Sequence, residues 1–187
     1  MTDTAASCAL FVTKIVEPSP GIRLITLPLP FELEHVNVGL VKVEDGYLLI
    51  DTGMTFGPLS KALEELGIGW REVKTVVATH IHPDHIACAP RIVEASGAKL
   101  AMHRAEFEYF NQILAGETYW MDAAFVEGGV PREGWDVIRR AVGGMRDTLS
   151  AIHPGRFLED GDALPTALGP AIVVATPGHS AGHICLH

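Results

Sequence analysis

The 187-residue sequence has no apolar run long enough to cross a membrane, and its start, Met1 to Ala6, has no basic and apolar leader. A membrane-spanning helix needs about 20 predominantly apolar residues, and a secretory leader needs a charged segment followed by an apolar one. We therefore expect a cytoplasmic protein without a membrane partner.

Cysteine and positive charge are also scarce. Cys8, Cys88 and Cys185 are scattered without a Cys-x-x-Cys pair, which argues against a disulfide framework and against a thiolate zinc site. The 14 Lys and Arg residues are outnumbered by 23 Asp and Glu residues, so the formal net charge is −9. Such a chain has no basic surface to neutralise phosphates, and we expect a small-molecule substrate and no nucleic acid partner.

The residues that are present suit one globular domain over residues 1–187, because 48% of them are hydrophobic and 20% are charged. Runs of β-branched and aliphatic residues alternate with apolar residues at helical spacing, which indicates an α/β (α+β) fold. Residues 105–152 have mainly helical spacing and are predicted to form a helical insertion within the domain. The predicted strands are residues 22–27, 36–43, 47–50, 73–79, 99–102, 156–158, 171–175 and 182–187, and the predicted helices before the insertion are residues 59–66 and 87–96.

The histidines are clustered, since five of the nine lie within residues 80–85 and 179–183. His80 and His82 directly follow a predicted strand and are two residues apart, so in extended chain they point to the same side, as metal ligands can. Asp84 and His85 add a carboxylate and a third imidazole, and burying all four without a cation would be costly. Pro83 fits a loop and argues against a helical His-Glu-x-x-His site.

These segments resemble the metallo-β-lactamase superfamily. The matching segments are Thr-His-x-His-x-Asp-His at residues 79–85, the strand-ending Asp-x-Gly turn at 51–53, Gly-Ala at 97–98 and the loop at 176–183. Ala87 and Cys88 stand where the family often has two glycines. The resemblance implies a four-layer αββα sandwich, of which this chain supplies the N-terminal half plus the helical insertion.

The same resemblance assigns roles to the clustered residues. It implies that His80, His82 and His179 hold a first metal ion, and that Asp84 and His85 serve a second. Asp51 is expected either to accept a hydrogen bond from a ligating histidine or simply to form a turn. His183 is expected to support its loop by hydrogen bonding, with metal binding as the less favoured alternative. Zinc is the expected metal, as one or two ions, although His and Asp ligands also suit iron and manganese. Flavodiiron relatives generally have a glutamate at the position of His82, which argues against redox chemistry.

The implied function is that of a metal-dependent hydrolase in the glyoxalase II and thioesterase branch. A zinc-bound hydroxide would attack a small thioester, ester or lactone, and Asp84 would orient the water or take its proton. A catalytically weak metal-binding or interaction module with the same fold is the alternative. The family's phosphodiesterases and nucleases fit the charge of −9 less well.

A serine hydrolase is a further alternative, because residues 178–182 satisfy Gly-x-Ser-x-Gly around Ser180. A nucleophile elbow must lie between a strand and a helix, whereas the residues after Gly182 are predicted to form a strand. This context argues against the serine mechanism.

The family's bridging aspartate and last histidine normally come from the second half of the sandwich, and neither has a candidate in this sequence. We therefore expect the sequence to be part of a longer chain. If it is complete, the binding-module hypothesis gains weight, and a homo-oligomer is left open.

Overall fold

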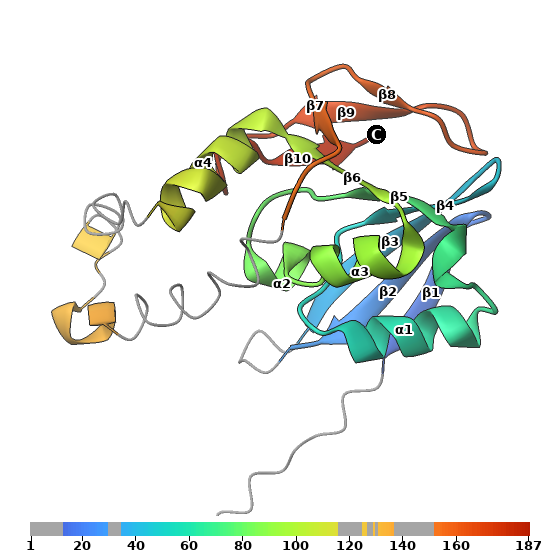
Figure 1. Cartoon of the computed structure of the whole chain (residues 1–187), viewed down its shortest axis with the longest axis horizontal. Coiled ribbons are helices and arrows are strands. Elements are labelled where there is room, and N and C mark those ends of the chain that lie inside the picture. Colours follow the sequence, from blue (N-terminus) through green and yellow to red (C-terminus); the bar gives the residue numbers. More distant parts are fainter. Residues whose placement is uncertain (1–12, 30–34, 116–124, 127–128, 130, 137–151) are drawn as a thin grey trace, which may run out of the picture.

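A computed structural model describes residues 13–29, 35–115, 125–126, 129, 131–136 and 152–187. Its main element is a seven-stranded sheet with the strands in chain order (Figure 1). Its strands are β1 (Lys14–Ser19), β2 (Ile22–Pro28), β3 (His35–Val43), β4 (Gly46–Ile50), β5 (Val73–Val77), β6 (Lys99–His103) and β7 (Arg156–Leu158). The predicted α/β fold class is confirmed.

The sheet changes from antiparallel to parallel at β4. Strands β1 to β4 form an antiparallel meander, and β4 to β7 run parallel to one another. The turn between β3 and β4 requires Gly46, because a Cβ there would collide with the carbonyl oxygen of Glu72. Parallel strands need crossover connections, and helices supply the first two of these.

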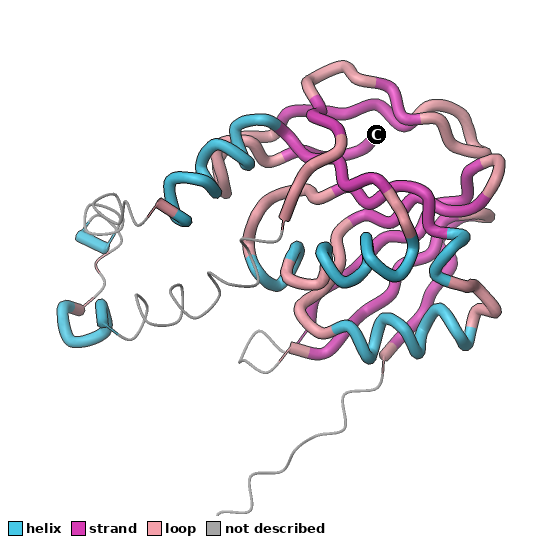
Figure 2. Tube along the Cα trace, viewed as in Figure 1, coloured by secondary structure: helices cyan, strands magenta, loops and turns pink. Residues whose placement is uncertain are grey.

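The crossover helices cover one face of the large sheet (Figure 2). Helix α1 (Phe56–Glu65) connects β4 to β5 through the short 3-10 helix η1 (Trp70–Glu72), and α3 (Ala89–Ser96) connects β5 to β6. Each buries one apolar stripe, with Leu59 and Leu63 on α1 and Ile92 on α3. Gly97, in the left-handed conformation, ends α3 as predicted. This packing forms the larger of the two cores.

A small antiparallel sheet packs on the other face (Figure 1). It consists of β8 (Ala163–Leu164), β9 (Ala171–Ala175) and β10 (Ile184–Leu186) in the order β10-β9-β8. Leu164, Val173 and Ile184 from this sheet bury against Leu48 and Val77 of the large one. Helices, large sheet and small sheet are therefore three successive layers, which agrees with the predicted sandwich.

The insertion predicted at residues 105–152 is only partly described. Helix α4 (Arg104–Leu114) covers its beginning and places Phe110 in the core. The second predicted helical face, from Val137 to Leu149, lies outside the described residues. None of the helices in the described part of the chain has the length and apolarity to cross a lipid bilayer. Cys88 is a buried free thiol and Cys185 an exposed one, whereas Cys8 lies outside the described residues.

Several local predictions differ from the structure. Strands β1 and β8 were not predicted, and β10 begins at Ile184 rather than at residue 182. Strand β5 ends at Val77 rather than Thr79. Pro83, predicted to lie in a loop, instead begins the short helix α2 (Pro83–Ile86). Proline suits the first position of a helix because its missing N–H needs no partner there.

Candidate metal centre

Two loops form the candidate site at the carboxyl end of β5. The first contains His80 and His82, between β5 and α2, and the second contains residues 176–183, between β9 and β10. The N–H of Ile184 donates a hydrogen bond of 3.1 Å to the carbonyl of Thr79, which holds the start of β10 against the first loop. The small sheet thus brings together histidines that are about a hundred positions apart in the sequence.

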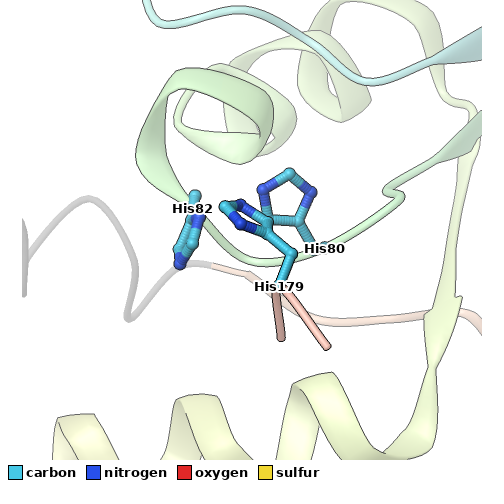
Figure 3. Close-up of side chains that lie close together, drawn as sticks. All are labelled: His80, His82 and His179. Carbon is cyan, nitrogen blue, oxygen red and sulfur yellow. The ribbon is translucent and has the colours of Figure 1, made fainter. Parts of the chain in front are cut away.

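His80, His82 and His179 converge on one point (Figure 3). One nitrogen atom from each ring lies within 4.8 Å of the others. The ring centroids of His82 and His179 are 4.5 Å apart, and those of His80 and His179 are 4.8 Å apart. His80 is buried, His82 half-buried and His179 exposed, so the group is open to solvent on one side. Three imidazoles with one open side are the donor set of a catalytic zinc site.

Hydrogen bonds fix the orientation of the His80 ring. The hydroxyl of Thr79 lies 3.0 and 2.9 Å from the two carboxylate oxygens of Asp51 and 2.9 Å from Nδ1 of His80. Because Asp51 takes the hydroxyl proton, Thr79 Oγ1 accepts from Nδ1–H of His80. The other ring nitrogen, Nε2, then carries a lone pair.

That lone pair is the observation that tests whether a metal ion fits. Nε2 of His80 is buried and finds no hydrogen-bond partner within the described part of the chain. A buried polar atom without a partner costs about 1–3 kcal/mol, and such atoms are rare in folded proteins. A cation coordinated by the three histidines would remove this cost, so the residues present fit a metal ion.

Asp84 and His85, the predicted ligands of a second ion, interact with each other in this structure. Nε2 of His85 lies 3.3 Å from Asp84, and Nδ1 lies 2.8 Å from Asp51. Burial lowers the pKa of His85, but the hydrogen bonds to the two carboxylates outweigh it and raise the pKa to about 9. The hydrogen bond to His85 lowers the pKa of Asp84. His85 is therefore an imidazolium held between two carboxylates.

The first-site histidines have the opposite electrostatic environment. Burial, followed by the positive charge of His85, lowers the pKa of His80 to about 3. Burial and the neighbouring His179 lower the pKa of His82. Both rings are thus neutral near pH 7, the protonation state that metal coordination requires.

His183 and Ser180 belong to the second loop. Nδ1 of His183 lies 2.7 Å from the hydroxyl of Thr176, and its ring centroid is 5.2 Å from that of His80. Oγ of Ser180 is buried and has no partner among the described residues. The strand β10 follows this loop, so Ser180 does not lie in the strand-to-helix turn of a nucleophile elbow.

Sequence reasoning missed two residues that contact the ligand loops. Thr79 orients His80, and the buried side chain of Glu106 accepts hydrogen bonds from both loops. Thr79 precedes the first histidine, so its proximity was a usable signal. Glu106 gave none, because an acidic residue in the first turn of a helix is ordinary.

Comparison with known proteins identifies relatives of this chain. It is 31% identical over 164 residues to an acyl-coenzyme A thioesterase, MBLAC2, from Gallus gallus, an alignment that covers 82% of this chain and 53% of the relative. The human protein of the same name is also 31% identical, over 163 residues. The chain spans about half the length of the curated relatives that it matches.

A solved structure is also similar to this chain. A metallo-beta-lactamase family protein from Thermus thermophilus superimposes with a TM-score of 0.69 at 29% identity, over 90% of this chain and 56% of that protein. The sequence model of the metallo-beta-lactamase superfamily matches residues 32–187, which include both histidine loops. The chain therefore belongs to the metallo-beta-lactamase superfamily.

Proposed function

We propose that this chain is the metal-binding part of a hydrolase that cleaves a small carbonyl substrate. The observation that carries the proposal is the convergence of His80, His82 and His179 around the partnerless Nε2 of His80. In this proposal the three histidines hold one ion, with zinc as the metal that best suits three imidazoles. Asp84 and His85 would serve a second ion by exchanging their mutual contact for coordination.

The residues around the site divide the work of hydrolysis. Zinc, when bound, lowers the pKa of a coordinated water to about 7 and so makes a hydroxide nucleophile available at neutral pH. Asp84 is ionised and half-buried beside the site, where it can accept a hydrogen bond from the attacking water and orient it. Thr79 and Asp51 keep His80 in the tautomer that presents Nε2 to the metal.

The proposed substrate is an acyl thioester, with oxyesters and lactones as chemically related candidates. Support comes from the acyl-coenzyme A thioesterases that share 31% identity with this chain over alignments that cover 82% of it. All three substrates are attacked at a carbonyl carbon and form a tetrahedral oxyanion, which a metal cation stabilises.

The test is an assay of one protein preparation with and without its metal. We expect purified chain loaded with zinc to hydrolyse an acyl-coenzyme A, to lose that activity when dialysed against a chelator, and to regain it when zinc is returned. Elemental analysis of the same samples measures the zinc bound per chain. The matched control is Ser180→Ala, which removes the candidate nucleophile of the alternative serine mechanism and leaves the histidines in place.

The outcomes separate the alternatives. Activity that survives chelation but is lost in Ser180→Ala would favour a serine hydrolase. Zinc bound without hydrolysis of any thioester, ester or lactone would favour a binding module of the same fold. Correctly folded protein that takes up no zinc would contradict the metal site itself.

A separate prediction concerns the hydroxyl of Thr79. Valine has nearly the same shape but cannot link Asp51 to Nδ1 of His80, so Thr79→Val should loosen the His80 ring and its tautomer. Residues that orient a metal-binding histidine are worth about 10–100-fold in metal affinity, and we expect a loss in that range. Competition with a chromophoric chelator measures the zinc affinity, and nitrogen-15 NMR of the imidazoles reports the tautomer.

Thr26→Val is the control for this prediction. It removes the hydroxyl of Thr26 on β2, which donates a hydrogen bond to the side chain of Asn37 on β3, within the meander. It should leave zinc affinity unchanged. Equal affinities of the two variants would show that Thr79 does not orient His80.

A further inference from the structure

Glu106 is a fully buried carboxylate in the first turn of α4, with 0% of its surface exposed. Each of its oxygen atoms accepts a hydrogen bond from a different loop of the metal centre. Oε2 accepts from the backbone N–H of Ile81 at 2.9 Å, and Oε1 accepts from the N–H of Gly182 at 2.6 Å. The carboxylate therefore connects two loops that are separated by about a hundred residues in sequence.

The positions of the two donors give this connection its importance. Ile81 lies between His80 and His82, so its peptide sets the direction of both side chains. Gly182 lies three residues after His179, in the loop that brings the third imidazole to the other two. A shift of either loop away from Glu106 would separate the nitrogen atoms that now lie within 4.8 Å of one another.

Steric contacts confirm that α4 lies directly against the second loop. A Cβ on Gly182 would lie 2.8 Å from the backbone nitrogen of Glu106 and 2.8 Å from Nδ1 of His103, closer than real Cβ atoms approach other atoms. His103 in turn accepts a hydrogen bond of 3.1 Å from the N–H of Ala105, which fixes the start of α4. Only glycine allows this approach, so the short bond to Glu106 depends on residue 182.

The negative charge of Glu106 also links this residue to the metal site. The hydrogen bonds that this carboxylate accepts from Ile81 and Gly182 are both donated by neutral backbone groups. Burying a carboxylate is costly, and hydrogen bonds from neutral donors offset only part of the cost. A cation held by the histidines beside it would offset more. The hydrogen bonds between Glu106 and the two loops should therefore be strongest when the metal is bound.

We propose that Glu106 is a positioning residue that holds the His80–His82 loop and the His179 loop together, so that the three-histidine site is formed before metal binds. It acts through the peptides of Ile81 and Gly182 and does not coordinate the metal itself. This inference rests on the proposed function, because it assumes that the three histidines bind the metal.

The most informative variant is Glu106→Gln, compared with Glu108→Gln on the exposed side of the same helix. A glutamine has the shape of glutamate, but its amide nitrogen is a donor and would face one of the two N–H groups. One loop would lose its acceptor and be pushed away. Glu106→Asp is the second variant, since it keeps the charge on a side chain too short to reach both loops.

Two measurements are made on each protein, with circular dichroism to establish that it is folded. Amide hydrogen exchange of the metal-free protein reports the bonds at Ile81 and Gly182, and chelator competition reports zinc affinity. We expect at least about tenfold faster exchange at one or both amides and about 10–100-fold weaker zinc binding in Glu106→Gln and Glu106→Asp. Glu108→Gln should match the wild type in both.

Three results would overturn the inference. Unchanged exchange at both amides in Glu106→Gln would show that the carboxylate does not hold the loops. Faster exchange with unchanged zinc affinity would show that the bonds have no positioning role. Wild-type affinity in Glu106→Asp would show that only the charge matters. If the wild type itself binds no zinc, the proposed function fails, and the exchange rates alone decide whether Glu106 joins the loops.

Discussion

Replacing Asp51 by alanine is expected to lower the free energy of unfolding of the metal-free chain by roughly 4 kcal/mol. Asp51 is 5% exposed and accepts hydrogen bonds from the N–H and hydroxyl of Thr79 and from Nδ1 of His85. Alanine would leave these donors without an acceptor, and each buried donor so abandoned costs about 1–3 kcal/mol.

The backbone adds to the loss. Asp51 has a φ of 62°, and among the described residues it alone combines a positive φ with a side chain larger than hydrogen. Aspartate and asparagine tolerate this left-handed conformation, whereas alanine is disfavoured there by about 1–2 kcal/mol. Typical domains are stable by about 5–15 kcal/mol, so the whole effect is a large part of the total.

Asp51→Asn separates the two contributions. Asparagine keeps the backbone preference and the shape but offers one acceptor atom and no charge, so its stability should lie between those of wild type and Asp51→Ala. The midpoint of urea unfolding in the presence of a chelator measures all three. Glu64→Ala, at an exposed position on α1, is the control and should unfold as wild type does. A loss below about 1 kcal/mol in Asp51→Ala would contradict this account, since surface substitutions already span that range.

Local patterns in the sequence predicted the described strands other than β1 and β8, and they marked the two histidine loops. Runs of β-branched residues ended at His80, and the second loop was bounded by predicted strands at 171–175 and 182–187. The structure places β9 and β10 there and brings His80, His82 and His179 to one point. The strands and loops are local features, because each depends on residues close together in the chain, whereas the meeting of the two loops was expected from the resemblance to the family.

The contacts of Glu106 could not be predicted in the same way. They join positions 25 and 76 residues apart, and only the packing of α4 against both loops brings them together. Residue type was uninformative, since Glu106 and Glu108 occupy the same helix and only one is buried.

The contacts and protonation of Asp84 and His85 also could not be predicted from the sequence. The resemblance to the family implies that they are ligands of a second ion, and that role stays a prediction. The structure shows in addition that His85 is shared by Asp51 and Asp84. A second ion would therefore compete with the proton that these carboxylates hold on His85, whose pKa is about 9. Binding at the second position should accordingly strengthen as the pH rises, whereas His80 and His82 are already neutral near pH 7.

His80→Ala should have two effects of opposite sign. Removal of one of three ligands should weaken zinc binding by about 100-fold or more, if the roughly 10–16 kcal/mol of a zinc site is shared among its ligands. In the metal-free chain, however, the same substitution should make stability less sensitive to acid. Chelator competition and urea unfolding at several pH values measure the two effects.

The acid effect follows from the burial of His80. The unfolded chain binds a proton at this residue below about pH 6.5, whereas the folded chain resists protonation until about pH 3. Acidification therefore favours the unfolded state, and between about pH 6.5 and 4.5 this residue alone removes up to about 1.4 kcal/mol of stability per pH unit. His85 has the opposite effect near pH 6.5, because its raised pKa keeps it protonated in the folded chain while the unfolded chain is only half protonated there. Below about pH 5.5 it contributes little, since both states are then protonated.

The slope of stability against pH is thus the decisive measurement, since His80→Ala also leaves a cavity that lowers stability at every pH. The slope of stability against pH should be smaller in His80→Ala than in the wild type by up to about 1.4 kcal/mol per pH unit, which corresponds to one proton. His82 continues to contribute to the slope of both chains. The exposed His35 provides the control, and His35→Ala should keep both the wild-type slope and the zinc affinity. Equal slopes in wild type and His80→Ala would show that the ring takes up its proton at the same pH in the folded and unfolded chains. That result would contradict the account in which burial lowers the pKa of His80.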